Sequence, residues 1–183
     1  MTKRKKNITI QGMIREIVQE GHPALRNQAK KVPIENIKTK EIQELIQDMH
    51  DSLATQKDGV ALAAPQIGVE KQIFVIAPFL FEKPEKEHLV YINPRIIMSS
   101  KEASWKSEGC LSCRWKVGEV MRKEAIEIEA YDENGEKFTV YGTGLLAHIF
   151  QHETDHFKGI LFLDKARKLR EMTQEEIDEI QGK

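Results

Sequence analysis

The residues of this chain with the clearest chemical potential are His152, Glu153 and His156, which form the pattern His-Glu-x-x-His. Residues four apart lie on one face of an α-helix, one turn apart, so the two imidazoles can bind the same divalent metal ion. Glu153 points to an adjoining face, where it could act as a general base on a metal-bound water without being a ligand. The pattern therefore predicts two metal ligands and one proton acceptor on a helix.

The surrounding sequence favours the helix that these roles require. Residues 144–150 contain no proline and few β-branched side chains, which gives adequate helix propensity. Gly159 follows soon after His156, and glycine is the usual residue just beyond a helix end. The opposing interpretation is a surface helix that carries two histidines by chance, because short motifs produce false matches.

A catalytic site of this kind usually has three protein ligands and one open position, so a third ligand must come from elsewhere in the chain. Cys110 and Cys113, in Cys-x-x-Cys spacing, are the candidates. Both could join the two histidines in a closed structural site, they could form a redox pair, or one could be a ligand while the other is incidental. A closed site would leave Glu153 without a water to activate, but spacing alone does not decide among the three.

A run of small residues at 59–68 contains one strong polar group, Gln66. Small side chains allow another chain to approach the backbone closely. Gly59, Pro65 and Gly68 predict a short extended segment that enters a turn. The Gln66 amide could donate to a developing oxyanion, although a packing loop with a solvated glutamine is the better interpretation of this segment taken alone.

The composition is that of an ordinary soluble protein. The 183 residues are 40% hydrophobic and 31% charged, with a net charge of -1, which does not indicate a wide nucleic-acid-binding face. No apolar run is long enough to span a bilayer, and no signal-peptide core follows the basic N-terminus, so we expect a cytoplasmic protein without DNA or membrane partners. The length fits a single catalytic domain, 1–183, with a flexible basic tail at 1–7 and a charged tail or helix at 165–183.

Periodicities along the chain predict the elements that position the chemical groups. Apolar residues recur at helical spacing in 39–55, and segments 72–77 and 89–97 are rich in the β-branched and aromatic residues of strands. The segment 124–130 alternates like a half-buried strand and precedes a hairpin turn, and residues 173–176 resemble a capping box. This order predicts an α+β fold with antiparallel or mixed strands around a central metal-binding helix that carries the HExxH pattern.

Three motifs, taken in order, resemble those of the peptide deformylases. They are GVALAAPQ at 59–66, EGCLS at 108–112 and QHETDH at 151–156. Each motif alone is a weak or moderate signal, but the ordered set is highly specific. The resemblance covers about residues 13–165.

The resemblance implies a hydrolase that removes the formyl group from the N-terminal formyl-methionine of newly made polypeptides and releases formate. It also implies a divalent metal ion held by Cys110, His152 and His156, with Glu153 as general base and acid. A thiolate ligand accepts iron(II) or zinc. We expect iron(II) in the cell, with zinc, nickel or cobalt as alternatives in the isolated protein.

Further roles carried over from the family concern the substrate. Gln66 and the backbone N–H of Leu111 are the implied oxyanion donors. The residues whose backbone would pair with an extended peptide are Gly59, Val60, Ala61, Glu108 and Gly109. The implied partner is a formyl-methionine nascent chain, with the ribosome as a candidate docking partner, and we expect a monomer.

The sequence departs from the family pattern at four positions, which is consistent with a divergent or secondary copy. Ala61 stands where the first motif normally has glycine, and Cys113 stands where an apolar residue is common. Lys106 and His148 lie near positions that line the methionine pocket in the family, so the usual side-chain preference is in question. The metal ligands and Glu153 are intact.

Two other functions fit parts of the pattern. A zinc peptidase of the HExxH class would need a third ligand downstream, where no further histidine occurs and Asp164 and Glu171 are the remaining candidates. A non-catalytic protein with a structural Cys2His2 metal site would use both cysteines and both histidines, and would unfold without Cys113.

Overall fold

The computed structural model describes residues 12–182, so the basic tail predicted at 1–7 lies outside the described residues. Its α-helices are α1 (Lys40–Ala54), α2 (Gly144–His156) and α3 (Gln174–Gln181). Its strands are β1 (Ala61–Ala63), β2 (Ile73–Ile76), β3 (Val90–Ser99), β4 (Ala103–Glu108), β5 (Lys116–Lys123), β6 (Ala125–Tyr131), β7 (Lys137–Thr143) and β8 (Arg167–Glu171). None of the helices in residues 12–182 combines the length and the apolarity needed to cross a bilayer.

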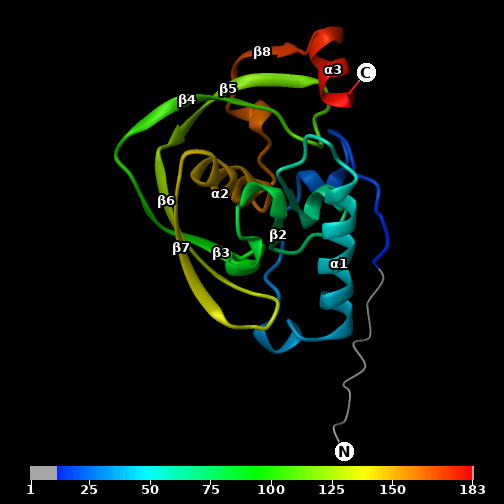
Figure 1. Cartoon of the computed structure of the whole chain (residues 1–183), viewed down its shortest axis with the longest axis vertical. Coiled ribbons are helices and arrows are strands. Elements are labelled where there is room, and N and C mark those ends of the chain that lie inside the picture. The colour runs from blue at the N-terminus through cyan, green and yellow to red at the C-terminus, as the bar shows by residue number, and fades with distance from the viewer. Residues whose placement is uncertain (1–11, 183) are drawn as a thin grey trace, which may run out of the picture.

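The strands form two antiparallel sheets, which confirms the predicted α+β class. The five-stranded sheet has the order β1-β2-β3-β6-β7, and the three-stranded sheet has the order β4-β5-β8. All the pairings between these strands are antiparallel (Figure 1). β1 and β4 each end a sheet order, so each strand pairs along one side only.

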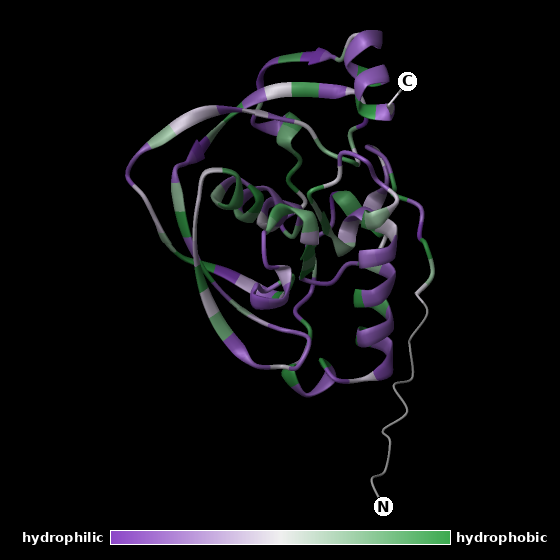
Figure 2. Ribbon diagram, viewed as in Figure 1, coloured by the Kyte–Doolittle hydropathy of each residue, from purple (hydrophilic) through white to green (hydrophobic). Residues whose placement is uncertain are grey.

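Helix α1 covers the five-stranded sheet with the apolar stripe that its spacing predicts. It follows Thr39 and ends at Thr55, as expected from the sequence. Its buried apolar side chains, which pack in one cluster with residues of β2 and β3, are Ile42, Leu45, Ile46, Met49 and Leu53. Figure 2 shows the purple, hydrophilic side of this helix turned outward. Burial of one stripe, rather than helix propensity alone, therefore fixes its position.

Helix α2 contacts strands of both sheets, namely β1, β3, β6 and β7 of the first and β5 of the second. Phe150 is fully buried, and its ring lies 5.4 Å from that of Tyr91. Gly159, just beyond the helix, has a φ of +68°, and a Cβ there would collide with the backbone carbonyl of Arg26. Glycine is therefore required where the chain turns away from α2.

Three strands were not predicted from the sequence. β4, β5 and β8 form the second sheet, and β8 lies inside the segment 165–183 that we expected to be a charged tail or helix. The terminal helix α3 does begin at the predicted capping box, where the Thr173 side chain accepts a hydrogen bond from the Glu176 N–H. Every residue of β8 is exposed, so its sequence carries no apolar alternation.

Candidate metal centre

Cys110, His152 and His156 come together in one cluster, with one ligand atom from each lying within 4.8 Å of the others. The Cys110 Sγ lies 3.5 Å from the His156 Nε2. A tetrahedral ion with ordinary metal–sulfur and metal–nitrogen distances would place such atoms about 3.6 Å apart. One thiol and two imidazoles at this spacing fit a divalent transition metal.

One helix and one turn of the second sheet position these ligands. The two histidines lie on α2, and their rings are 5.0 Å apart and nearly perpendicular. Cys110 lies in the turn between β4 and β5, where its carbonyl accepts a hydrogen bond of 3.0 Å from the Cys113 N–H. The second sheet, which the sequence pattern did not reveal, therefore supplies the third member of the cluster.

The Glu108 carboxylate forms hydrogen bonds with three side chains at the candidate metal centre. Its Oε1 lies 2.6 Å from the His152 Nδ1, and its Oε2 lies 2.6 Å from the His148 Nε2. The Arg122 guanidinium donates to both oxygens, at 2.7 and 2.9 Å. Because a carboxylate only accepts hydrogen bonds, the His152 Nδ1 carries the proton and the Nε2 is left free to bind a metal ion.

Charge in this network is balanced within the protein interior. Burial alone would raise the pKa of Glu108, but hydrogen bonds from His148, His152 and Arg122 outweigh burial and hold the pKa well below its usual range. Arg122 also donates to Asp155 at 2.7 Å, and Asp155 in turn accepts from Lys165 at 2.6 Å. Each of these two carboxylates thus has a cationic partner, which offsets the cost of placing a charge in the protein interior.

Glu153 lies beside the cluster without belonging to it. The residue is 4% exposed, and its Oε2 has no hydrogen-bond partner in residues 12–182. Burial raises the pKa of this carboxyl group to about 7. A group with a pKa near neutral can both accept and return a proton, which is what acid–base catalysis requires.

Gln66 and Leu111 present hydrogen-bond donors near the cluster. The Gln66 Oε1 accepts from the Ala63 N–H at 2.8 Å, which fixes the orientation of the amide. The Gln66 Nε2 donates to the Cys110 Sγ at 3.4 Å, which leaves its second N–H for another acceptor. Within residues 12–182 the Leu111 N–H has no acceptor. Both donors are therefore available for an oxygen atom that lies beside the metal centre.

A cleft of about 300 Å³ opens over the cluster. Among the predicted site residues, those that line it are Gly59, Val60, Ala61, Gln66, Glu108, Gly109, Cys110, Leu111 and His152. Glu153 and His156 are buried and do not line the cleft. The cleft lies where the free side of β1 and the end of β4 face each other, so an extended peptide can reach backbone groups of both sheets.

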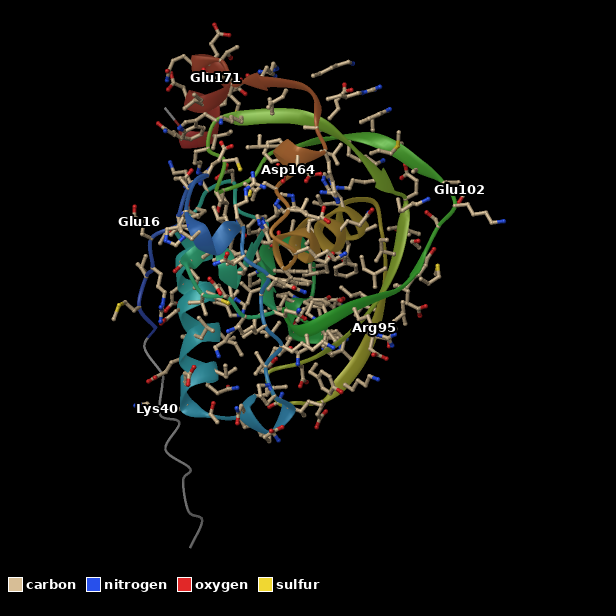
Figure 3. The ribbon with its side chains drawn as sticks, turned by 180° about the vertical axis from the view of Figure 1, so that it is seen from behind. Glu16, Lys40, Arg95, Glu102, Asp164 and Glu171 are labelled. Carbon is tan, nitrogen blue, oxygen red and sulfur yellow. The ribbon has the colours of Figure 1, made fainter. Side chains whose placement is uncertain are left out.

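These positions bear on the two alternative functions that the sequence left open. Cys113 is outside the ligand cluster and is buried with Leu25, Val120, Leu161 and Phe162. Asp164 pairs with Arg26, and Glu171 lies on the surface next to α3 (Figure 3). A closed Cys2His2 site and a downstream carboxylate ligand therefore both lack support.

Other residues of the site were missed by sequence reasoning. Arg122 and the side-chain role of Glu108 depend on contacts between strands and α2, so no local spacing indicates them. Arg114, Trp115 and Met172 also line the cleft, although nothing in their sequence context marks them. Lys106 pairs with Glu124 at 3.1 Å and is not part of the cleft wall, whereas His148 is.

Replacing Cys113 by alanine should leave one bound metal ion per chain, because Cys113 is not a member of the ligand cluster. Replacing Cys110 by alanine should weaken metal binding by more than about 100-fold. Mutation of a group that only hydrogen-bonds to a metal ligand already lowers metal affinity by about 10- to 100-fold. Metal content after dialysis, measured by atomic absorption, compares the two variants directly. Loss of the metal from Cys113→Ala would contradict the three-ligand arrangement.

The comparisons with known proteins agree with this geometry. The family model described as polypeptide deformylase matches residues 14–172. The chain is 40% identical over 161 residues to peptide deformylase 2 of Clostridium perfringens, covering 88% of this chain and 98% of that protein.

Solved structures of this kind are also similar. A peptide deformylase from Legionella pneumophila matches with a TM-score of 0.76 and 38% identity, covering 85% of this chain and 88% of that one. A peptide deformylase from Synechococcus elongatus in complex with actinonin matches with a TM-score of 0.74 and 34% identity, covering 92% of this chain and 84% of that one. The chain belongs to the peptide deformylase family.

Proposed function

We propose that this protein is a metal-dependent hydrolase that removes the N-formyl group from the N-terminal formyl-methionine of nascent polypeptides and releases formate. The observation that supports this most strongly is the cluster of one thiol and two imidazoles beneath a cleft, with a partnerless buried carboxylate beside it. Membership of the deformylase family agrees with it. Such a centre suits a hydrolase that acts on an amide. In this proposal α2 is the metal-binding helix around which the strands are arranged.

The substrate backbone would lie between the two sheets. We assign its binding to the backbone around Val60 and Ala61 on one side and around Glu108 and Gly109 on the other, with Gly59 beside Val60 in the cleft wall. A Cβ at Gly59 would lie 2.7 Å from the Leu53 side chain, so a glycine allows the chain to pass close to α1. An added strand of this kind gains backbone hydrogen bonds whatever the sequence of the peptide.

The catalytic groups act on the formyl amide as follows. Cys110, His152 and His156 would hold a divalent ion, which would supply Lewis acidity and make water a nucleophile near neutral pH. Glu153 takes a proton from the attacking water on its carboxylate and returns it to the departing amine. The Gln66 Nε2 and the Leu111 N–H donate hydrogen bonds to the formyl oxygen as negative charge develops there.

The donor set also limits which metal would serve. A thiolate with two neutral imidazoles is softer than a site of oxygen ligands and excludes magnesium and calcium as the resident ion. We propose iron(II) as the ion in the cell, with zinc, nickel or cobalt as functional replacements in the isolated protein.

We propose a cytoplasmic monomer with a single catalytic domain, 1–183, that acts on nascent chains without DNA or membrane partners, and with the ribosome as its place of encounter. The modest net charge of -1 agrees with a peptide substrate rather than a nucleic acid.

Formate release from a formyl-methionine tripeptide is the test of this function. Protein prepared without oxygen and loaded with iron(II) should release stoichiometric formate. Treatment with a chelator should abolish the release, and re-addition of iron(II) should restore it, because the nucleophile depends on the metal. A folded protein with one bound metal ion and no formate release would refute the proposed reaction.

A further inference from the structure

One stripe of α2 forms a wall of the cleft. Leu145, His148, Ile149 and His152 all line the cleft, and their spacing of three and four residues places them on one face of the helix. Ile149 packs in a buried apolar cluster, His152 belongs to the metal-ligand cluster, and Leu145 is exposed. His148 places an imidazole beside these two aliphatic side chains, one turn before His152.

The ring of His148 is fixed at one edge. Its Nε2 lies 2.6 Å from the Glu108 Oε2, in a carboxylate that also holds His152 and Arg122. Since this carboxylate accepts hydrogen bonds only, the His148 Nε2 is the nitrogen that donates, which leaves Nδ1 as the nitrogen that can accept a hydrogen bond. The network that orients the metal ligand thereby also fixes the tautomer of His148.

The other edge of the ring is available to a ligand. In residues 12–182 the Nδ1 has no hydrogen-bond partner, and it is not among the buried partnerless atoms of this part of the chain. The His148 side chain is 16% exposed. An acceptor atom thus remains free on a residue that lines the cleft.

If the proposed function holds, the His148 Nδ1 lies close to the side chain of the first residue of the substrate. The formyl carbon must lie beside Cys110 and His152, and the α-carbon of the first residue is only two bonds away. Residues one helical turn apart have Cβ atoms about 5–6 Å apart. The first side chain therefore begins within reach of the His148 ring.

We propose that His148 is a specificity-determining residue, which gives the wall facing the first side chain one hydrogen-bond acceptor among aliphatic groups. Beyond formyl-methionine peptides, the class of substrate that this acceptor admits is an N-formyl peptide whose first side chain has the length of methionine and ends in an N–H donor, with glutamine as the matching case. Methionine is accepted by the aliphatic part of the wall, but it leaves the Nδ1 without a donor. The enzyme therefore discriminates less against a polar first residue than it would with an aliphatic residue at this position.

The test compares formyl-Gln-Ala-Ser with formyl-Met-Ala-Ser. The measured quantity is the ratio of their kcat/KM values for metal-loaded protein, with metal content determined for each variant. His148→Ile should lower the glutamine-to-methionine ratio by about 2- to 10-fold, the value of one hydrogen bond. His148→Asn, whose amide occupies the region of Nδ1, should recover most of the ratio. His88→Ile changes a histidine outside the cleft wall and should leave the ratio as in the unmodified protein.

An effect on both peptides by the same factor would mean that His148 only supports Glu108, and would overturn the inference. The dissociation constants of the two peptides, measured by calorimetry on metal-loaded protein, give a second readout that does not need turnover. If the unmodified protein releases no formate from either peptide, the proposed function fails. The inference then still stands if His148→Ile shifts the ratio of dissociation constants, and is refuted if the ratio is unchanged.

Discussion

Replacing Glu153 by glutamine should lower kcat/KM for hydrolysis of a formyl-methionine peptide by about 10²- to 10⁴-fold, the usual contribution of a positioned acid–base group. Glutamine has nearly the same shape, but its amide cannot accept a proton. Metal content should remain at one ion per chain, because Glu153 is not part of the ligand cluster. The variant therefore separates proton transfer from metal binding.

A glutamate on the surface provides the matched control. Glu119 on β5 pairs with Arg167 and Lys168, away from the cleft wall. Glu119→Gln should release formate at the rate of the unmodified protein. Steady-state kinetics with both variants, each loaded with iron(II), would decide the role. Full activity in Glu153→Gln would remove this residue from the mechanism and would require another base.

The second large effect is expected on stability. Replacing Arg122 by methionine should lower the free energy of unfolding by about 3–5 kcal/mol, because the change removes the guanidinium that pairs with the buried Glu108 carboxylate and leaves Asp155 with Lys165 alone. The Arg122 side chain is 4% exposed, and it lies 2.7 Å from both the Glu108 Oε1 and the Asp155 Oδ2. Methionine preserves much of the length of the side chain, so the loss reports on charge rather than on a cavity.

Urea denaturation followed by circular dichroism would measure this difference. Arg95→Met is the matched control, because Arg95 pairs with Glu129 on the surface and its side chain is 68% exposed (Figure 3). An exposed pair contributes about 0–1 kcal/mol, so the control should unfold close to the unmodified protein. Equal midpoints for the two variants would mean that Glu108 and Asp155 are not held by Arg122 in solution.

The first sheet was predictable from the sequence because its strands bury one face or both. Segments at 72–77 and 89–97 correspond to β2 and β3, and the alternation at 124–130 corresponds to β6. The apolar stripe of α1 could be recognised in the sequence for the same reason. Each of these elements carries its burial pattern in its own residues, which is the signal that periodicity detects.

The second sheet carries no such signal. β8 consists of five exposed residues, four of them charged, and it is held by contacts with partners that are distant in sequence. The Arg167 guanidinium, for example, lies 3.6 Å from the centre of the Trp105 ring on β4. Cross-strand contacts of this kind decide a strand in its tertiary context, where local propensity is weak.

The metal centre shows the same division. His152, Glu153 and His156 were recognisable because their spacing on one helix has a geometric meaning. Only the family resemblance favoured Cys110 over Cys113, because the Cys-x-x-Cys spacing does not indicate which of the two thiols binds the metal. The network behind the ligands joins β4, β5 and α2, so its existence depends on the fold.

The proposed binding of substrate in the cleft between β1 and the end of β4 also has a consequence for timing. A cleft that binds its substrate as a single added strand would accept only a chain end that is not yet paired with anything else. Synthesis proceeds at about 5–20 residues per second, and domains fold as units once they emerge. A new N-terminus can therefore bind in this cleft only while it remains extended. A protein whose first residues fold early would keep its formyl group.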